Sequence, residues 1–136
     1  MLMHTGCNGL LEENPRGLMA PEGFFKKPAD VEAAVYGAYA EWVTLNIEKE
    51  YLLSLILRID MAEIGDRNTT GGRVVINDFN MDARNNMTRL TWNGLFQAIA
   101  AANTAIKGAR QIEADQAIKD KLEAQARFIR AFTYYH

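Results

Sequence analysis

Helical periodicity constrains the fold of this chain more than any other feature of its sequence. Apolar side chains recur at spacings of three and four residues, which places them on one face of an α-helix. Four segments show this pattern: residues 30–43, 48–63, 88–109 and 115–135. The sequence therefore predicts an all-α fold built from antiparallel helix pairs.

The third of these segments carries two kinds of surface. One is an apolar stripe that we expect to be buried, made of Trp92, Leu95, Phe96, Ile99, Ala102 and Ile106. The other is a set of small residues that admits a neighbouring helix closely: Ala98, Ala100, Ala101, Ala102 and Ala105. In the first segment, Gly37 is expected to permit a similar close approach.

The segments outside these helices differ in composition. All three prolines lie before residue 29, so residues 8–28 predict an extended tether that Phe24 and Phe25 anchor to the helical body. Residues 66–87 are rich in Asn, Asp, Thr and Gly. They predict a long polar loop, with a short extended piece at residues 74–76.

Composition excludes several classes of protein. The net charge of −2 leaves no basic excess for neutralising phosphates, so nucleic-acid binding is not expected. The longest apolar run, residues 51–59, is interrupted by Ser54 and Arg58 and is too short to span a membrane. One cysteine and two histidines offer no disulfide framework, zinc site or nucleophile–base pair. We therefore predict no catalytic residues, no metal and no cofactor.

The single cysteine, Cys7, follows a small residue, Gly6, as at the end of a bacterial lipoprotein signal. The charged and apolar regions that should precede it are absent. One interpretation is that residues 1–7 are the remnant of such a signal and that Cys7 is lipidated. The other is an ordinary free thiol.

The last two helical segments contain a split repeat signature. Tetratricopeptide units place W-x2-L on one helix and A-x3-F-x2-A on the next. Trp92 and Leu95 match the first half, and Ala124, Phe128 and Ala131 match the second. The spacing is longer than the standard unit, but the pattern predicts that bulky side chains of one helix pack against alanines of the other.

Five short motifs follow one another along the chain. They are Leu11-Glu12-Glu13-Asn14-Pro15 after Cys7; Phe24-Phe25 ahead of Tyr36-Gly37-Ala38-Tyr39; Gly65-Asp66; Trp92-x3-Phe96-x2-Ile99-x3-Asn103-x2-Ile106; and Glu123-Ala124-x-Ala126-Arg127-Phe128-x-Arg130-Ala131-Phe132-x-Tyr134-Tyr135. In this order they resemble the SusD/RagB family of outer-membrane glycan-binding lipoproteins of Bacteroidetes.

The resemblance implies a tetratricopeptide-like all-α fold with a second, loop-rich subdomain. Residues 29–136 would be the N-terminal helical domain, truncated at its C-terminus. It also implies a non-catalytic, surface-exposed lipoprotein of the outer membrane, held only by a lipid on Cys7. Such a protein captures oligosaccharide for a SusC-like TonB-dependent transporter.

Within the polar loop, five residues are candidates for ligand contact: Asn77, Asp78, Phe79, Asn80 and Arg84. They combine planar hydrogen-bonding groups with an aromatic face, the mixture that binds sugars. The alternative is a polar loop that meets only solvent or the transporter. Elsewhere, Tyr39, Trp42 and Trp92 are expected in the core, and Asn103 and Arg130 are expected to fix helix contacts.

Two other functions stay open from the residues alone. An α-helical tetratricopeptide-like scaffold could bind a peptide or protein between its helices. A helical hydrolase or metalloenzyme is disfavoured because no histidine cluster is present.

Overall fold

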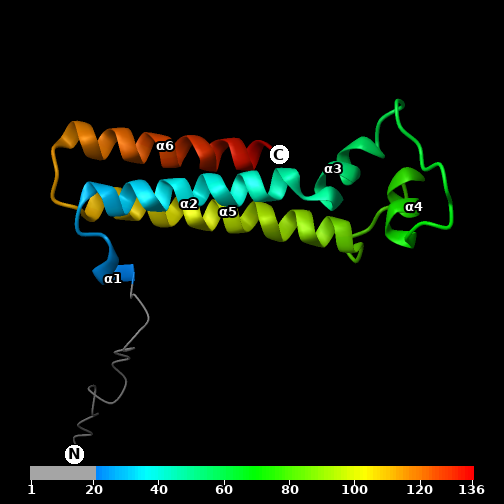
Figure 1. Ribbon diagram of the computed structural model, residues 1–136, viewed down its shortest axis with the longest axis horizontal. Helices are drawn as coiled ribbons and strands as arrows, with labels where there is room; N and C mark the ends of the chain where they lie inside the picture. The colour runs from blue at the N-terminus through cyan, green and yellow to red at the C-terminus, as the bar shows by residue number, and fades with distance from the viewer. Residues whose placement is uncertain (1–20) are drawn as a thin grey trace, which may run out of the picture.

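A computed structural model describes residues 21–136 (Figure 1). Those residues form α-helices and no strand, which confirms the predicted all-α class. The helices are α1 (Pro21–Phe24), α2 (Pro28–Ile47), α3 (Lys49–Ile56), α4 (Gly71–Asn77), α5 (Asn86–Gln111) and α6 (Gln116–Tyr135).

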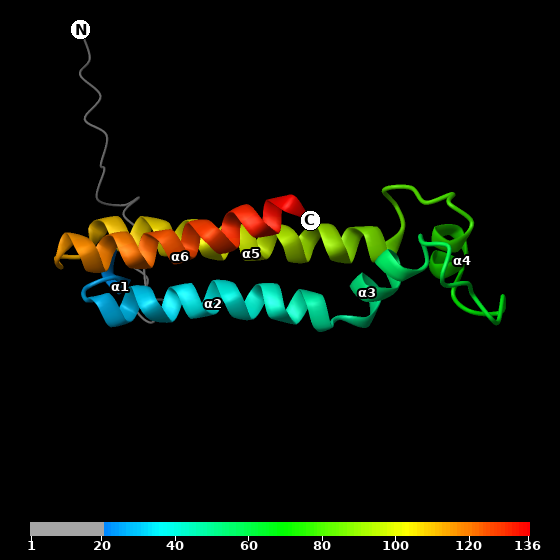
Figure 2. The ribbon, with the colours of Figure 1, turned by 90° about the horizontal axis from the view of Figure 1, so that it is seen from above.

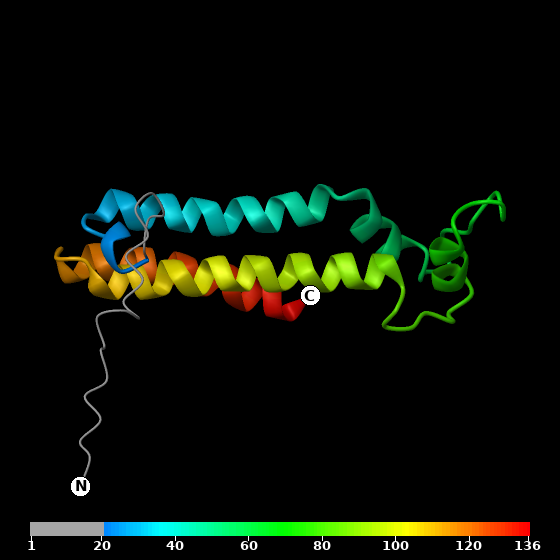
Figure 3. The same cartoon turned by 90° about the horizontal axis from the view of Figure 1, so that it is seen from below.

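The three long helices, α2, α5 and α6, lie side by side as an elongated bundle (Figures 1 and 2). α5 runs antiparallel to both of the others and contacts both. α3 and α4 lie at one end of the bundle and α1 lies at the other, as Figure 3 also shows. The predicted antiparallel helix pairs are therefore confirmed.

The core of the bundle depends on small residues of α5. Ala98, Ala102, Ala105 and Ala109 have no exposed surface. The last three belong to core clusters with Val31, Val35 and Ala38 of α2 and with Leu122, Ala126 and Ile129 of α6. The predicted small-residue surface is therefore present, although Ala100 faces outward.

Two glycines of α5 extend this surface. A Cβ on Gly108 would lie 2.6 Å from the ring of Phe25, and a Cβ on Gly94 would lie 2.7 Å from Cδ1 of Leu45. Gly37 has nothing within 4 Å of such a Cβ, so the close approach predicted there is wrong. The burial of Phe25 against α5 confirms that the Phe24-Phe25 pair anchors the chain to the helical body.

α2 begins at Pro28, two residues before the helical segment expected at residues 30–43. Asp30 lies inside the first turn, where its Oδ2 accepts hydrogen bonds from the backbone N–H groups of Lys26 (2.9 Å) and Lys27 (3.0 Å). These bonds, led by that of Lys26, lower the pKa of Asp30. The carboxylate therefore caps the helix from its first turn, because it accepts hydrogen bonds from the backbone of the two residues that precede α2.

Polar contacts join α5 to α6 in a regular antiparallel register. The carboxylate of Glu123 contacts Arg110 of α5 at 2.7 Å and Arg127 of α6 at 2.6 Å. Arg130 donates to Oδ1 of Asn103 across the same pair at 2.8 Å, which confirms that these two residues fix a helix contact. Hydrogen bonds from Arg110 and then Arg127 lower the pKa of Glu123 to about 2.

The helix predicted over residues 48–63 is shorter than expected. α3 ends at Ile56, and the turn that follows contains Leu57 to Asp60. Leu52, Leu55 and Ile59 are each about half exposed, so the apolar stripe expected there is only partly buried.

The polar loop predicted over residues 66–87 contains a helix. α4 occupies Gly71–Asn77, so the extended piece expected at residues 74–76 is wrong. The seven residues of α4 span only two turns, too few to show a helical period. They nevertheless form a helix in which Ile76 is almost fully buried.

The repeat signature does not pack as predicted. Trp92 is 62% exposed and Phe128 is 60% exposed, and Ala124 and Ala131 also face outward. Trp92 is therefore no core residue, whereas Trp42 and Tyr39 are partly buried against the core, as expected. On α6, the residues buried in the core are Leu122, Ala126 and Ile129, which lie on a different face from Ala124, Phe128 and Ala131 of the signature.

Cys7 and most of the predicted tether lie outside the described residues. The last residues of that tether, Pro21–Phe24, form α1. Among the described helices, none combines the length and the apolar character that crossing a membrane requires.

The contact between Gly108 and Phe25 predicts opposite effects for two glycine substitutions. Gly108→Ala forces a methyl group into the ring of Phe25, and overpacking of this kind costs about 1–3 kcal/mol. Gly37→Ala meets no neighbour and gains helix propensity of about 1 kcal/mol. Urea unfolding of the two variants measures both effects.

The matched control removes the ring itself. In a Phe25→Ala background, Gly108→Ala should no longer destabilise, because the atoms that it strikes are gone. A Gly108→Ala penalty of the same size in both backgrounds would contradict the assigned contact.

The lowered pKa of Glu123 predicts an acid-sensitive link between α5 and α6. A carboxylate with a depressed pKa contributes stability above its unfolded value of 4.5, and this contribution is lost as pH falls toward about 2. In Glu123→Gln, the urea midpoint should therefore fall less steeply over that interval than in the parent chain. Glu113→Gln, at an exposed carboxylate in the turn before α6, is the control and should leave the slope unchanged.

Candidate functional site

The candidate residues for ligand contact lie in the end cap, which we define as residues 57–85. The end cap comprises the chain after α3, the helix α4 and the loop that enters α5, and it closes one end of the bundle (Figure 1). Its residues Leu57 and Ile76 form a small core with Met87 of α5. Leu53 of α3 and Ile64 and Met81 of the end cap pack against this core. The candidates are therefore held by a structured element.

Asn85 ties the end cap to the bundle. It is buried at the start of α5, where its Oδ1 accepts a hydrogen bond from the N–H of Met87 at 2.8 Å. Its Nδ2 donates to the carbonyl of Gly72 in the first turn of α4 at 2.9 Å. One amide side chain thus caps α5 and positions α4. The sequence analysis missed this residue, although an Asn ahead of a helical segment is a recognised N-cap signal.

Asn77, the first candidate, has a structural role. Its Oδ1 accepts a hydrogen bond from the N–H of Ile64 at 3.0 Å, which holds the chain after α3 against α4. Its Nδ2 donates to the neighbouring Asp78 at 3.2 Å. The side chain is therefore already engaged on both sides.

Phe79 has an unusual backbone conformation. It follows the C-cap residue Asp78 of α4 and has φ of 55°, in the left-handed region. Its N–H donates to Ile76 at 3.1 Å, and the N–H of Asn80 donates to Val75 at 2.8 Å. This pair of bonds defines a Schellman motif, in which the left-handed position is usually glycine. Here it holds a phenylalanine that is 71% exposed.

The left-handed conformation has an energetic cost for a residue with a Cβ, roughly 1–2 kcal/mol. Phe79 buries too little of its ring to offset that cost by packing. A strained backbone position of this kind is a reason to consider function.

Two ion pairs involve carboxylates that lie on either side of Phe79 in the sequence. Arg67 contacts Asp78 at 2.7 Å, and Arg84 contacts Asp82 at 2.9 Å. Hydrogen bonds from Arg84 lower the pKa of Asp82. The guanidinium of Arg84 itself is almost fully exposed, which leaves its remaining donors open to solvent.

The structure brings some of the candidates together. Asn80 and Arg84 line one shallow depression, whose other lining residues are Gly71, Gly72, Val75, Asp82, Asn85 and Asn86. Asn77, Asp78 and Phe79 do not line it. The lining of the depression therefore carries amide, carboxylate and guanidinium groups. Phe79 immediately precedes one of these lining residues, Asn80, in the sequence.

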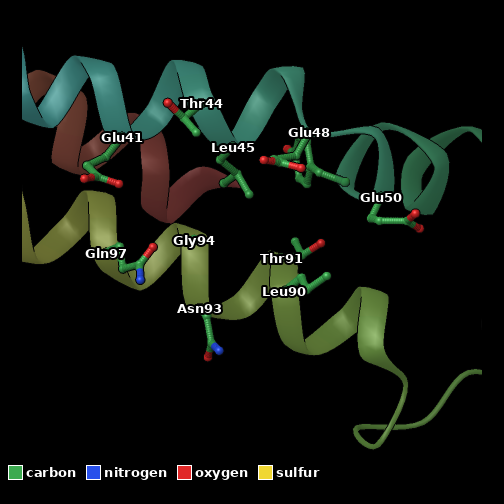
Figure 4. A pocket seen from close by; sticks show the side chains of 11 residues that line it. Glu41, Thr44, Leu45, Glu48, Glu50, Leu90, Thr91, Asn93, Gly94 and Gln97 are labelled. Carbon is green, nitrogen blue, oxygen red and sulfur yellow. The ribbon is translucent and has the colours of Figure 1, made fainter.

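A second groove, of about 300 Å³, lies between the end of α2, α3 and α5 (Figure 4). The carboxylate of Glu41 points from α2 toward α5, whereas Asn93 points away. Glu48 and Glu50 also line the groove, and Glu50 is paired with Arg73 at 2.9 Å. This acidic lining makes the groove a poor site for an anionic ligand. The sequence analysis did not identify it, because its residues come from three separate segments.

A third groove, of about 410 Å³, lies between α3, the first half of α5 and the end of α6. Its walls are mainly apolar and include Leu55, Trp92, Leu95, Phe96 and Ile99. The rings of Trp92 and Phe96 lie 4.7 Å apart.

Among residues 21–136, no group of three or more His, Cys, Asp or Glu side chains is arranged to hold a metal ion. The end cap presents hydrogen-bonding groups of Asn80, Asp82 and Arg84 in the depression described above.

The sequence is similar to two curated proteins of Formosa agariphila. It is 44% identical over 137 residues to SusD-like protein P2, and the aligned region covers all of this chain and 27% of that relative. It is 28% identical over 141 residues to SusD-like protein P25, and the aligned region covers 96% of this chain and 26% of that relative. The chain thus spans about a quarter of the length of each. The similarity confirms the resemblance found in the motifs.

No protein-family model matches the sequence. No solved structure matches it either.

The double role of Asn85 predicts that its loss destabilises the end cap. Asn85→Ala removes the cap of α5 and the link to Gly72, and we expect it to cost about 1–2 kcal/mol of unfolding free energy. Amide hydrogen exchange should accelerate in α4 and leave α6 unchanged.

Asn85→Asp separates the two roles. The aspartate still accepts from Met87, but it cannot donate to Gly72. It should therefore keep most of the stability of α5 and still accelerate exchange in α4. Unchanged exchange in α4 for both variants would contradict the assigned link.

Proposed function

We propose that this chain, which is homologous to SusD-like proteins along its whole length, is part of a glycan-binding protein of the cell surface. In this proposal the protein captures oligosaccharide and passes it to a SusC-like TonB-dependent transporter in the outer membrane. The observation that carries the proposal is the 44% identity to SusD-like protein P2 over the entire chain.

The end cap supports a role in sugar contact. Carbohydrates present C–H groups that pack on an aromatic face and hydroxyl groups that pair with planar donors and acceptors. Phe79 offers an exposed ring, and Asn80 and Arg84 offer such groups in the neighbouring depression. We propose these three residues as ligand contacts. Asn77 and Asp78 then act by holding the residues just before Phe79 against Ile64 and Arg67.

The strain at Phe79 strengthens this assignment. Glycine would suit the left-handed position better, and the ring contributes little to the core. A ligand that packs on the ring would explain why a phenylalanine is present at a position where it contributes little to stability. The same ring could alternatively contact the transporter.

The proposal places the protein at the outer membrane through a lipid on Cys7 and makes binding, without catalysis, its activity. Both follow from the family resemblance of the motifs. A peptide-binding helical scaffold is the alternative, and it predicts peptide affinity in place of glycan affinity.

The strained aromatic predicts a trade-off between stability and binding. Phe79→Gly should raise the unfolding free energy by roughly 1 kcal/mol, because it relieves the left-handed strain. The same change should weaken glycan binding by about tenfold or more, equivalent to about 1.4 kcal/mol. A glycan array with the protein at its natural length identifies the ligand, and calorimetry then gives the affinities of parent and variant.

Tyr36→Ala provides the control, since Tyr36 is 64% exposed on α2, away from the end cap. It should leave glycan affinity unchanged. Glycan binding that survives Phe79→Gly would remove Phe79 from the site. The absence of any glycan ligand, together with affinity for peptides, would contradict the proposed function itself.

A further inference from the structure

The groove between the end of α2, α3 and α5 carries charge of one sign. Glu41, Glu48 and Glu50 line it, and no lysine, arginine or histidine is among the described residues that do so. Glu50 is paired with Arg73, whereas Glu41 and Glu48 are in no ion pair with a described side chain. A cleft lined by one sign of charge concentrates ions of the opposite sign. We call this cleft the acidic groove.

The backbone fixes the positions from which these carboxylates extend. Glu48 has an extended conformation between α2 and α3, where it ends one helix and begins the next. Its N–H donates to the carbonyls of Thr44 (3.2 Å) and Leu45 (3.1 Å), and its own carbonyl accepts from Leu52 at 3.2 Å. Glu41 lies on α2, about two turns earlier, and its carboxylate points toward α5 (Figure 4).

Two hydroxyl groups of the lining have no hydrogen-bonding partner within the described part of the chain. Tyr51 is only 5% exposed; its carbonyl accepts from Ser54, but its hydroxyl makes no hydrogen bond there. The Oγ1 of Thr91 is buried and equally unpartnered. Both residues line the acidic groove, and both also line the apolar groove. Leaving a buried polar group unpaired is destabilising, so these hydroxyls are a second indication of a ligand.

The lining also indicates the chemistry of that ligand. Carboxylates accept hydrogen bonds and do not donate them, so the groove suits a molecule rich in donors. The volume of about 300 Å³ is at the lower end of small-ligand sites. Because the described residues offer no group of side chains arranged to hold a metal ion, an organic cation fits the charge better than a metal does. The other polar side chains that line the groove are Thr44, Tyr51, Thr91, Asn93 and Gln97.

We propose that the acidic groove binds a compact, hydroxylated organic cation with the chemistry of a protonated amino sugar. Its ammonium group contacts Glu41 and Glu48, and its hydroxyl groups pair with Tyr51 and Thr91. None of these four residues belongs to the end cap, so this site does not rest on the glycan contacts proposed there.

Saturation-transfer difference NMR of the protein at its natural length tests the proposal. The probe is D-glucosamine at about pH 6, where its amine is protonated. We expect it to bind at least about tenfold more tightly than D-glucose or N-acetyl-D-glucosamine, because neither of these carries the charge. Equal affinities for the three sugars would overturn the proposal. Ethanolamine bound as tightly as D-glucosamine would overturn the assignment of a sugar, because the ammonium group alone would then be recognised.

Substitutions test the location of the site. Glu41→Gln and Glu48→Gln should each weaken D-glucosamine binding by about fivefold or more, because each removes a charged acceptor. Glu113→Gln makes the same change outside the groove and should leave the affinity unchanged. Phe79→Gly should also leave it unchanged, which separates a failure of this site from a failure of the glycan contacts in the end cap. Unchanged binding in both groove variants, or lost binding in Phe79→Gly, would overturn the proposal.

Tyr51→Phe gives an independent readout. It removes an unpartnered hydroxyl and keeps the ring, so the melting temperature of the ligand-free protein should be unchanged or higher. D-glucosamine binding should nevertheless weaken by about threefold or more, because one hydrogen bond to the ligand is lost. A lower melting temperature with unchanged affinity would give this hydroxyl a structural role and overturn its assignment to the ligand.

Discussion

The close contact of α5 with its two neighbours is the interaction on which the rest of this structure depends. Alanines at 102, 105 and 109 leave room for residues of α2, among them Val31 and Val35, and for Leu122 and Ile129 of α6. Small residues let helix axes approach until dispersion contacts are made along their whole length. Gly108 takes this furthest, because the ring of Phe25 occupies the volume of its missing Cβ. The packing of Phe25 against α5 thus depends on the absence of a Cβ at residue 108.

The long helices could be predicted from the sequence because their apolar periods extend over many turns. Helix ends and exposures could not be predicted as well. α6 has two apolar faces, one with Ile129 and one with Phe128, and the sequence alone does not say which face meets α5. The repeat signature selected the face with Phe128, whereas the structure buries the face with Ile129. Tertiary packing decided between two faces that periodicity treats alike.

The end cap shows the same limit at the candidate site. Its residues look like a loop because α4 is only two turns long and is polar around Asn77. The buried Ile76 and the amide of Asn85 nevertheless form a small core and a cap. A polar surface with one exposed aromatic ring could be predicted from the residue types alone. The structural hydrogen bond of Asn77 could not be predicted in the same way, because its partner, the N–H of Ile64, lies 13 residues away in the sequence.

Phe79 and Trp92 are both exposed aromatic residues, yet the structure gives them different meanings. Phe79 has a left-handed backbone that glycine would adopt at lower cost, so its ring is retained against the preference of the fold. Trp92 lies within the regular helix α5 and lines an apolar groove with residues of α3 and of the end of α6. Backbone conformation therefore separates an aromatic residue that is kept at a strained position from one that lies on a regular helix.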